Sequence, residues 1–486
     1  MGNKILARVH IFFGGLCFIG VNLFILTQIK MSEICPCREK QDLTRSYCNK
    51  PKYWYTGNDY NLQNLHAVLQ RIGYEKASEK SPWTLYWGSK DPFKYKLTPQ
   101  RKVNRFPGSG ALTSKVSLAT TESTYIPKAF KFPRDKTAFL KYAEEHKDTL
   151  FMEKKSTHRG ISIKNITEIN LKSGKTFVQE FMQKPLLIDG HKFDIGVFVA
   201  LTSVNPLRAY WYKADMLFRF CKDQYYPFDP KKFNKYVVAD GYLKFWKIPS
   251  LSYPFTELGY GMKDVFDIYM KSKGIDPKTI WEDVLDAITD VMLKKEKDII
   301  KVRDKYPPQD SFFEIMRFDL ILDENLKVYL LEANIPDLNS KQEPSYKILN
   351  EQLFYNLFTL VGVADHLKQY NASEISPQEQ QAAKDMLSAQ KNIAVWGEEC
   401  ITTCRNSCIA LPVCNLCNHC TDTNTRETLL KTYREHLHRG EFRRLWPPPM
   451  DANVLDLDKL KGLSKNNELM YLWCQGKCNI DTTWCT

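Results

Sequence analysis

Two short apolar runs on either side of a polar turn constrain the fold of this chain more than any other feature of its 486 residues. Residues 311–334 are typical of two strands that meet at the Asp-Glu-Asn turn of residues 323–325. Glu332 and Asn334 are two residues apart, so their side chains project from the same face of a strand. On an antiparallel neighbouring strand, Asp319 can project from that face as well. The sequence therefore predicts a hairpin with three polar side chains on one face.

The chemistry of these three side chains suits a divalent cation. Two carboxylates and an amide oxygen are hard ligands, of the kind that binds Mg²⁺ while the ion also contacts nucleotide phosphates. The same pattern also fits a hairpin whose outward face is simply polar. Spacing alone does not decide between these two interpretations.

The rest of the chain predicts an α/β (α+β) fold with several parts. Residues 195–202 are rich in β-branched and aromatic side chains, as strands are, and residues 281–302 carry apolar side chains at helical spacing. Such segments alternate through the middle of the chain. The predicted parts are a small N-terminal α/β domain (51–134), two central and C-terminal lobes (135–365), a polar helical linker (366–395) and a cysteine-rich C-terminal region (396–486).

Most of the 14 cysteines lie near the two ends of the chain. Cys17 and Cys221 stand apart, and the other twelve are an even number, which predicts disulfides that stabilise the flanks. A zinc site is the alternative, because Cys414, Cys417 and Cys420 resemble half of one, but no second Cys-x2-Cys lies at zinc-ribbon spacing. The twelve are Cys35, Cys37, Cys48, Cys400, Cys404, Cys408, Cys414, Cys417, Cys420, Cys474, Cys478 and Cys485.

The N-terminus contains an apolar segment at residues 9–29, preceded by Lys4 and Arg8. At ~1.5 Å per residue this segment reaches about 30 Å, one hydrocarbon thickness. It predicts an uncleaved transmembrane signal-anchor, with residues 1–8 as a short cytosolic tail and residues 30–50 as a stem. A cleaved signal peptide is the alternative. The expected localisation is a single-pass type II membrane protein of the endoplasmic reticulum or Golgi with a lumenal catalytic domain.

The formal net charge of +13 favours an acidic partner. A nucleotide, an anionic membrane surface, an acidic polypeptide and a nucleic acid all meet that description. The chain has no arginine-rich low-complexity tract and no nucleic-acid motif, so we do not expect it to bind nucleic acid.

Six segments, in order along the chain, resemble the tubulin–tyrosine ligase-like family of ATP-grasp ligases. The resemblance covers about residues 100–365 and is specific because the order is kept. The matching segments are Asn104-Arg-Phe-Pro-Gly108 with Lys115, Phe151-Met-Glu-Lys154 followed by Arg159-Gly160-Ile161, Gln179 in a Val-Gln-x-x hinge, Pro185 to Asp194, Arg219 in Met-Leu-Phe-Arg-Phe, and the strand pair with Asp319, Glu332 and Asn334.

The resemblance implies a role for each matched residue. Lys115 and Lys154 would neutralise nucleotide phosphates, and Gly160 would let the backbone approach a phosphate. Gln179 would face the adenine edge. Lys192 and Asp194, two apart on one strand face, would point toward the nucleotide.

The same resemblance implies the reaction and its cofactors, ATP and Mg²⁺. Arg219 would stabilise charge on the transferring phosphoryl group, and Asp319, Glu332 and Asn334 would hold Mg²⁺, with Glu332 also catalytic. A carboxylate would be activated as an acyl phosphate, and the amine of free glutamate would then form an amide. In the glutamylating branch the acceptor is the acidic tail of tubulin. The membrane contact would be made by residues 9–29.

Two positions depart from the family pattern. Gly196 stands where the Lys-Phe-Asp-Leu-Arg motif has arginine, and Asp240 stands where the family has an amide. By analogy with removed transition-state donors, a lost cation would cost about 2.7–4 kcal/mol. The alternative function is therefore a divergent, weakly active or inactive ATP-binding protein of the secretory pathway. A carbohydrate-modifying enzyme has no positive motif here.

Overall fold

The structure is a computed structural model that describes residues 50–486 apart from short gaps. The gaps are residues 89–91, 94, 96, 99–100, 156–159, 173, 175, 239–240, 337, 339–343 and 369–389. Residues 50–486 form one compact unit. Several predictions fall outside the described residues, namely those on 1–8, 9–29, nearly all of 30–50, Cys17, Cys35, Cys37, Cys48, Arg159, Asp240 and most of the linker.

A parallel four-stranded sheet comes first in the described chain, in the order β2-β1-β3-β4. Aromatic side chains fill it: Trp54 contacts both Trp83 and Tyr86. Helix α2 (Gln63–Arg71) buries its apolar face beside this sheet and packs on α9 (Pro344–Leu360). The strands are β1 (Lys52–Thr56), β2 (Glu75–Lys76), β3 (Leu85–Gly88) and β4 (Lys102–Val103).

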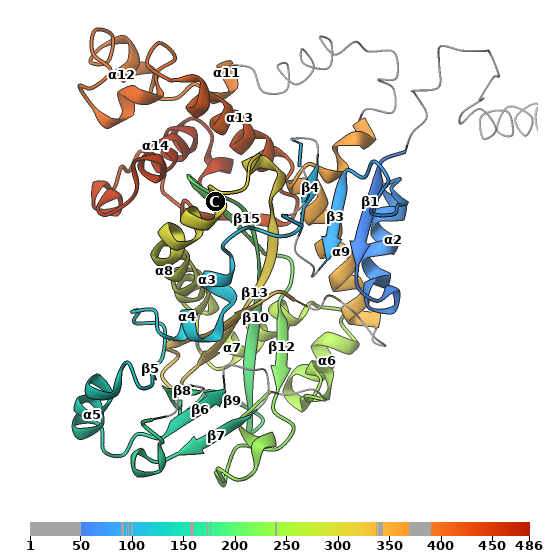
Figure 1. The fold of residues 1–486 in the computed structure, drawn as a ribbon, viewed down its shortest axis with the longest axis vertical. Helices are drawn as coiled ribbons and strands as arrows, with labels where there is room; N and C mark the ends of the chain where they lie inside the picture. The colour runs from blue at the N-terminus through green and yellow to red at the C-terminus, as the bar shows by residue number, and fades with distance from the viewer. Residues whose placement is uncertain are drawn as a thin grey trace, which may run out of the picture. The chain divides into compact units, whose positions relative to one another are not determined.

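The central sheet has seven antiparallel strands, in the order β14-β13-β10-β11-β15, with β9 and β12 also paired to β10 (Figure 1). The 14 residues of β10 are almost all buried, so this strand is the centre of the core. The strands are β9 (Leu187–Ile188), β10 (His191–Val204), β11 (Leu207–Tyr212), β12 (Leu217–Phe220), β13 (Glu314–Leu322), β14 (Val328–Asn334) and β15 (Phe442–Trp446).

A long helix, α8 (Pro277–Arg303), covers part of the central sheet and contacts β10, β14 and β15. Pro277 occupies its first turn, and the Asp276 side chain accepts a hydrogen bond from Lys278 N, so the start of the helix is capped. Val284, Ile288 and Val291 recur at helical spacing and are fully buried. Burial of such side chains stabilises the fold by about 1.5–3 kcal/mol each.

The third sheet is antiparallel, in the order β5-β8-β6-β7, and has a core of its own. Phe139 on α5 (Lys136–Glu145) packs edge-to-face against Phe130, Phe132 and Phe151. The strands are β5 (Ala129–Lys131), β6 (Phe151–Lys155), β7 (Ile161–Lys164) and β8 (Thr176–Glu180). The mixed α/β class predicted from the sequence is confirmed.

The remaining helices are short or belong to the C-terminal part. The α-helices are α3 (Gly110–Thr113), α4 (Lys115–Ala119), α6 (Pro249–Thr256), α7 (Met262–Ser272), α11 (Gln390–Ile393), α12 (Gly397–Ile401), α13 (Thr423–Leu437) and α14 (Lys465–Ile480). The 3-10 turns are η1 (Asp59–Leu62), η2 (Ile166–Glu168), η3 (Phe233–Lys235), η4 (Phe245–Lys247), η5 (Gln309–Ser311), η6 (Val363–Lys368), η7 (Pro412–Leu416), η8 (Leu457–Leu460) and η9 (Thr482–Trp484).

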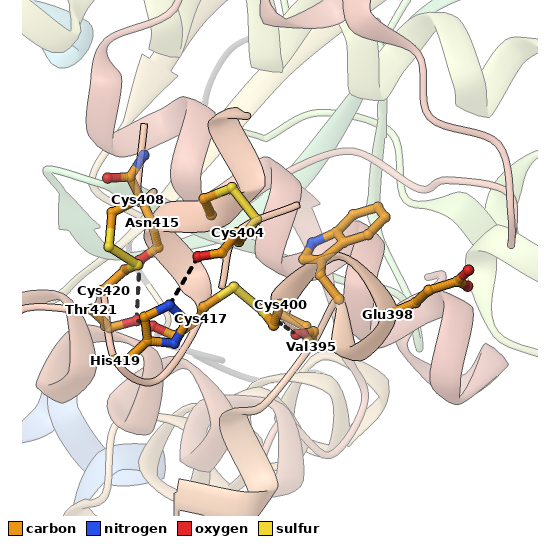
Figure 2. The surroundings of a disulfide bond; sticks show 12 residues. Val395, Glu398, Cys400, Cys404, Cys408, Asn415, Cys417, His419, Cys420 and Thr421 are labelled. Carbon is orange, nitrogen blue, oxygen red and sulfur yellow. Dashed lines mark hydrogen bonds between the residues drawn. A yellow bond between two sulfur atoms is a disulfide. The ribbon is translucent and has the colours of Figure 1, made fainter. Parts of the chain in front are cut away.

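Disulfides staple the C-terminal region, as predicted. The pairs are Cys400–Cys417, Cys404–Cys414, Cys408–Cys420 and Cys478–Cys485. Figure 2 shows the first three pairs. It also shows the His419 ring, whose Nε2 is hydrogen-bonded to the carbonyl oxygen of Cys404 at 3.0 Å.

The zinc alternative for this region is wrong, because each sulfur that it needed is held in a disulfide and offers no thiolate. His419 cannot form a zinc site with the neighbouring Cys408 and Cys420 either, because the sulfurs of these two cysteines are bonded to each other. One pairing prediction also fails. Cys474 is a buried free thiol, as is Cys221.

The predicted membrane topology is corrected by the helices of the described chain. Within residues 50–486, outside the gaps given above, no helix is long and apolar enough to cross a membrane. The 27-residue α8 has the length, but its sequence is rich in Lys, Asp and Glu. The predicted localisation is corrected accordingly: no helix of the described residues supports a membrane span, and the segment predicted to span, residues 9–29, lies outside those residues. A length that matches the bilayer is necessary for a span but does not establish one.

Candidate active site

Neighbouring strands of the central sheet bring four predicted residues together. Asp194 on β10 lies opposite Arg219 on β12, and Asp319 on β13 lies opposite Glu332 on β14. The predicted antiparallel strand pair is thus confirmed, with Asn334 two residues beyond Glu332. Because the strands are in register, the side chains of these residues meet on one face.

Asp319 is the centre of this cluster and is almost fully buried. Its Oδ1 accepts a 2.6 Å hydrogen bond from Arg317 Nε. Its Oδ2 accepts bonds from Arg317 Nη2 at 2.9 Å, Arg219 Nη2 at 3.0 Å and Asn334 Nδ2 at 2.8 Å. Burial alone would raise the pKa of Asp319, but the two guanidinium groups outweigh it and the pKa is lowered. Asp319 is therefore ionised at neutral pH.

Arg219 bridges two carboxylates. Its Nε and Nη2 donate to Asp194 at 2.9 and 2.8 Å, a bidentate pair, and the same Nη2 reaches Asp319. Burial raises the pKa of Asp194 to about 6, in spite of the opposing effect of Arg219. The two aspartates also raise the pKa of Arg219 against the effect of its own burial. Asp194 and Arg219 thus fix each other's side chains at the centre of the sheet.

Glu332 lies at the more exposed edge of the cluster. Its side chain is 32% exposed and its Oε2 is 3.5 Å from Lys115 Nζ. Lys115 begins α4, whose N-cap Ser114 accepts a bond from Ser117 N. The Asn104–Gly108 motif before Lys115 has a structural role, because its glycine packs closely against α8. A β-carbon on Gly108 would lie 2.7 Å from the backbone oxygen of Ile299. This close approach holds the segment that presents Lys115.

Lys154 and Gln179 lie on paired strands of the third sheet. Lys154 Nζ donates to Gln179 Oε1 at 2.8 Å, and Gln179 Nε2 donates to the Pro127 carbonyl at 3.1 Å. Burial lowers the pKa of Lys154 to about 8, although the charge of Glu332 acts to raise it. Glu332 is on the central sheet, so charges on the two sheets act on each other.

Lys192 lies two residues before Asp194 on β10. Its Nζ donates to the Tyr236 carbonyl at 3.1 Å and lies 5.3 Å from the centre of the Phe181 ring. Burial lowers the pKa of Lys192.

Gly160 begins the described chain after the gap at 156–159 and has a φ of 99°, a conformation that favours glycine. The described chain gives Gly160 no contact with the charged cluster. Its position before β7 (Ile161–Lys164) is what the structure establishes.

Arg317 is a site residue that the sequence analysis missed. It lies two residues before Asp319 on β13, so both side chains point to one face. A signal was available, because an arginine inside an otherwise apolar strand is rarely buried without a partner. The family resemblance places the expected cation at position 196 instead.

The donor set of the cluster fits a hard divalent cation. Asp319, Glu332 and Asn334 offer carboxylate and amide oxygens from adjacent strand positions. Asn334 uses its Nδ2 on Asp319, so its ligand atom would be Oδ1. Asp319 already accepts four hydrogen bonds, about as many as a carboxylate accommodates. Glu332, being more exposed, is the carboxylate that a cation reaches with least rearrangement.

Comparison with known proteins places the chain in a family. Residues 94–369 match the family model described as "TTL: Tubulin-tyrosine ligase family". The chain is also 34% identical over 440 residues to the Caenorhabditis elegans protein named "Probable tubulin polyglutamylase ttll-15", which covers 87% of this chain and 84% of that protein. The chain belongs to the tubulin-tyrosine ligase family.

More distant family members share a smaller part. A Mus musculus protein named "Tubulin monoglutamylase TTLL4" is 28% identical over 339 residues, 64% of this chain and 28% of that protein. A Danio rerio protein named "Tubulin polyglutamylase ttll6" is 26% identical over 376 residues, 72% of this chain and 47% of that protein. The chain thus spans less than half of these two relatives.

Proposed function

We propose that this chain is an ATP-dependent ligase that adds glutamate to acidic side chains of a protein acceptor, with tubulin as that acceptor. The observation that carries the proposal is the charged cluster on the central sheet of a tubulin-tyrosine ligase family member. The names of the relatives, tubulin polyglutamylases and a monoglutamylase, support the choice of amino acid and acceptor. The basic character of the chain suits an acidic tail.

The proposed fold is an ATP-grasp, in which the third sheet and the central sheet hold the nucleotide between them. Lys154 and Lys115 would bind its phosphates, and Gln179, which orients Lys154, would lie on the adenine side. Gly160 would allow a phosphate to approach the backbone, and Lys192 and Asp194 would complete the nucleotide site. Asp319, Glu332 and Asn334 would hold Mg²⁺, which when bound neutralises phosphate charge.

The proposed reaction has two steps. An acceptor carboxylate oxygen forms a bond to the γ-phosphorus as the bond to the bridging oxygen breaks, which gives an acyl phosphate and ADP. The amine of glutamate then attacks the acyl carbon, and phosphate leaves as the amide forms. Arg219 would stabilise the negative charge that builds up on the transferred phosphoryl oxygens, since its guanidinium is already held in place by Asp194 and Asp319.

Labelled glutamate tests the proposal directly. The full chain is incubated with ATP, Mg²⁺, labelled glutamate and tubulin, and label on tubulin is measured. We expect incorporation by the wild type, and loss of about 10²–10³ in rate for Glu332→Gln. Glu324→Gln is the matched control, because Glu324 is half-exposed in the β13–β14 turn and pairs only with Lys184 among the ion pairs of the described chain. A wild-type chain that binds Mg-ATP but transfers no glutamate to tubulin would refute the proposal.

A further inference from the structure

We propose that Arg317 contacts the transferring phosphoryl group and supplies the cation that the family motif places at position 196. This inference rests on the proposed function and identifies a residue of the same site. It explains how a chain with Gly196 keeps a positive charge at the reacting end of the nucleotide.

The space over Gly196 is filled by Arg317. Gly196 on β10 pairs with Asp319 on β13, and Arg317 lies two residues earlier on β13. A β-carbon built on Gly196 would lie 2.7 Å from Arg317 Cδ and 3.2 Å from its Cγ and Nε. Carbon atoms do not approach so closely in packed interiors, because van der Waals contact between them is at about 3.5–4.0 Å. A side chain at 196 and the present position of Arg317 therefore exclude each other.

Backbone conformation does not explain the glycine. Gly196 is in the middle of β10, and it is not among the glycines with positive φ. Any residue could adopt its extended conformation. Position 196 therefore requires a residue without a side chain, because Arg317 occupies the space that a side chain would need.

The head group of Arg317 lies at the centre of the charged cluster. It makes two hydrogen bonds to Asp319, the carboxylate beside Arg219 and Asn334. An arginine on either strand reaches this point, because the two strands are paired neighbours. Its planar guanidinium can bind two oxygens of one phosphoryl group, which an ammonium group cannot do.

The balance of charge around Arg317 favours an anionic ligand. The residues predicted for the site, together with Arg317, supply five cationic side chains and three carboxylates, which leaves an excess of positive charge. The cations are Lys115, Lys154, Lys192, Arg219 and Arg317, and the carboxylates are Asp194, Asp319 and Glu332. Arg219 shares its single charge between Asp194 and Asp319, and Asn334 is neutral, so Arg317 balances Asp319 while the group as a whole keeps its excess of positive charge.

Moving the arginine between the two strands tests the inference. The variants are Arg317→Met, Arg317→Lys, Gly196→Arg and the exchanged double variant Gly196→Arg with Arg317→Gly. Three quantities are measured for each: glutamate transfer, Mg-ATP affinity by calorimetry and the midpoint of thermal unfolding. Arg105→Met is the matched control, because Arg105 pairs with the buried Glu314 at the other end of β13.

We expect Arg317→Met to fold, to lose 10²–10³ in transfer rate and to bind Mg-ATP at least fivefold more weakly. Arg317→Lys should keep the affinity but lose at least tenfold in rate, since it cannot form the bidentate contact. Gly196→Arg should unfold at a lower temperature, because two arginines compete for one space. The exchanged variant should regain at least tenfold in rate over Arg317→Met and unfold at nearly the wild-type temperature.

Two results would overturn the inference. A folded Arg317→Met variant with wild-type rate and affinity, or with tighter Mg-ATP binding, would mean that Arg317 only shields Asp319. If the exchanged variant folds but is no more active than Arg317→Met, an arginine at position 196 cannot take over the role of Arg317. The calorimetric measurement of Mg-ATP affinity needs no acceptor protein. If tubulin is the wrong acceptor, the affinity difference between the wild type and Arg317→Met should still be seen, so failure of the proposed function can be told apart from failure of the inference about Arg317.

Discussion

The charged cluster on the central sheet and the C-terminal cysteine-rich region are held together in opposite ways. In the cluster, ion pairs and hydrogen bonds between neighbouring strands fix Asp194, Arg219 and Asp319, and the contacts can exchange partners when a ligand enters. In the C-terminal region, four disulfides fix the chain around a separate apolar core. We therefore expect damage to the charged cluster to affect the chemistry most, and damage to the C-terminal region to affect stability alone.

The largest expected effect is that of Asp319→Asn. This change leaves two guanidinium groups with one carboxylate fewer and removes a proposed Mg²⁺ ligand. We expect the rate of glutamate transfer to fall by about 10³ and the free energy of unfolding to fall by about 3 kcal/mol. Denaturant unfolding and glutamate transfer are both measured.

Glu435→Gln is the control for Asp319→Asn. Glu435 on α13 pairs with Arg208 and accepts a bond from Tyr210, away from the cluster. We expect it to lose comparable stability and to keep the wild-type rate. Equal losses of rate in the two variants would mean that the loss follows from lower stability and not from a role of Asp319 in the chemistry.

A smaller effect is expected from opening one disulfide. In the chain-entropy model, a bridge across a separation of 17 residues, as in Cys400–Cys417, stabilises by about 3 kcal/mol. The double variant Cys400→Ser with Cys417→Ser should therefore show faster hydrogen exchange in residues 396–420 and a lower unfolding midpoint. Its rate of glutamate transfer at 25 °C should stay within twofold of the wild type. A loss of Mg-ATP affinity in this variant would show that the C-terminal region supports the site.

The smallest expected effect is a pH dependence of nucleotide affinity. Burial lowers the pKa of Lys154 from its ordinary 10.5 to about 8, so the side chain loses its charge as the pH rises through 8. If the charged form binds the phosphates, Mg-ATP affinity should fall about tenfold between pH 7 and pH 9. Lys154→Arg should remove that dependence, because arginine stays charged. A wild-type affinity that is flat over this range would exclude Lys154 as a phosphate contact.

The local parts of both regions could be predicted from the sequence. The strand pair with Asp319, Glu332 and Asn334 follows from strand periodicity and a turn, which are short-range signals. The disulfide-rich character of residues 396–486 follows from cysteine number and position. Which cysteine pairs with which does not follow from the sequence. The free thiol of Cys474 shows that an even number of cysteines does not mean that each of them forms a disulfide.

The contacts between distant segments could not be predicted. Strand β15 joins the central sheet by pairing with β11, more than 200 residues earlier, and no local pattern encodes such a partner. Arg317 was missed for the same reason. Its significance depends on Gly196, which lies opposite only because β10 and β13 are paired in one register. The membrane prediction depended on the apolar length of residues 9–29 and on the charges before them, and the described residues contain no helix that could span a membrane.

The coupling of ADP release to glutamate transfer shows whether the charged cluster is a ligase site. The full chain is supplied with ATP and Mg²⁺, and ADP and glutamyl-tubulin are counted in the same reaction, with tubulin or glutamate left out in turn. An acyl-phosphate ligase should release about one ADP for each glutamate added, and complete turnover should need both substrates. Sustained ADP release without tubulin, or glutamate transfer without ATP, would contradict the assignment of the central cluster as a ligase site.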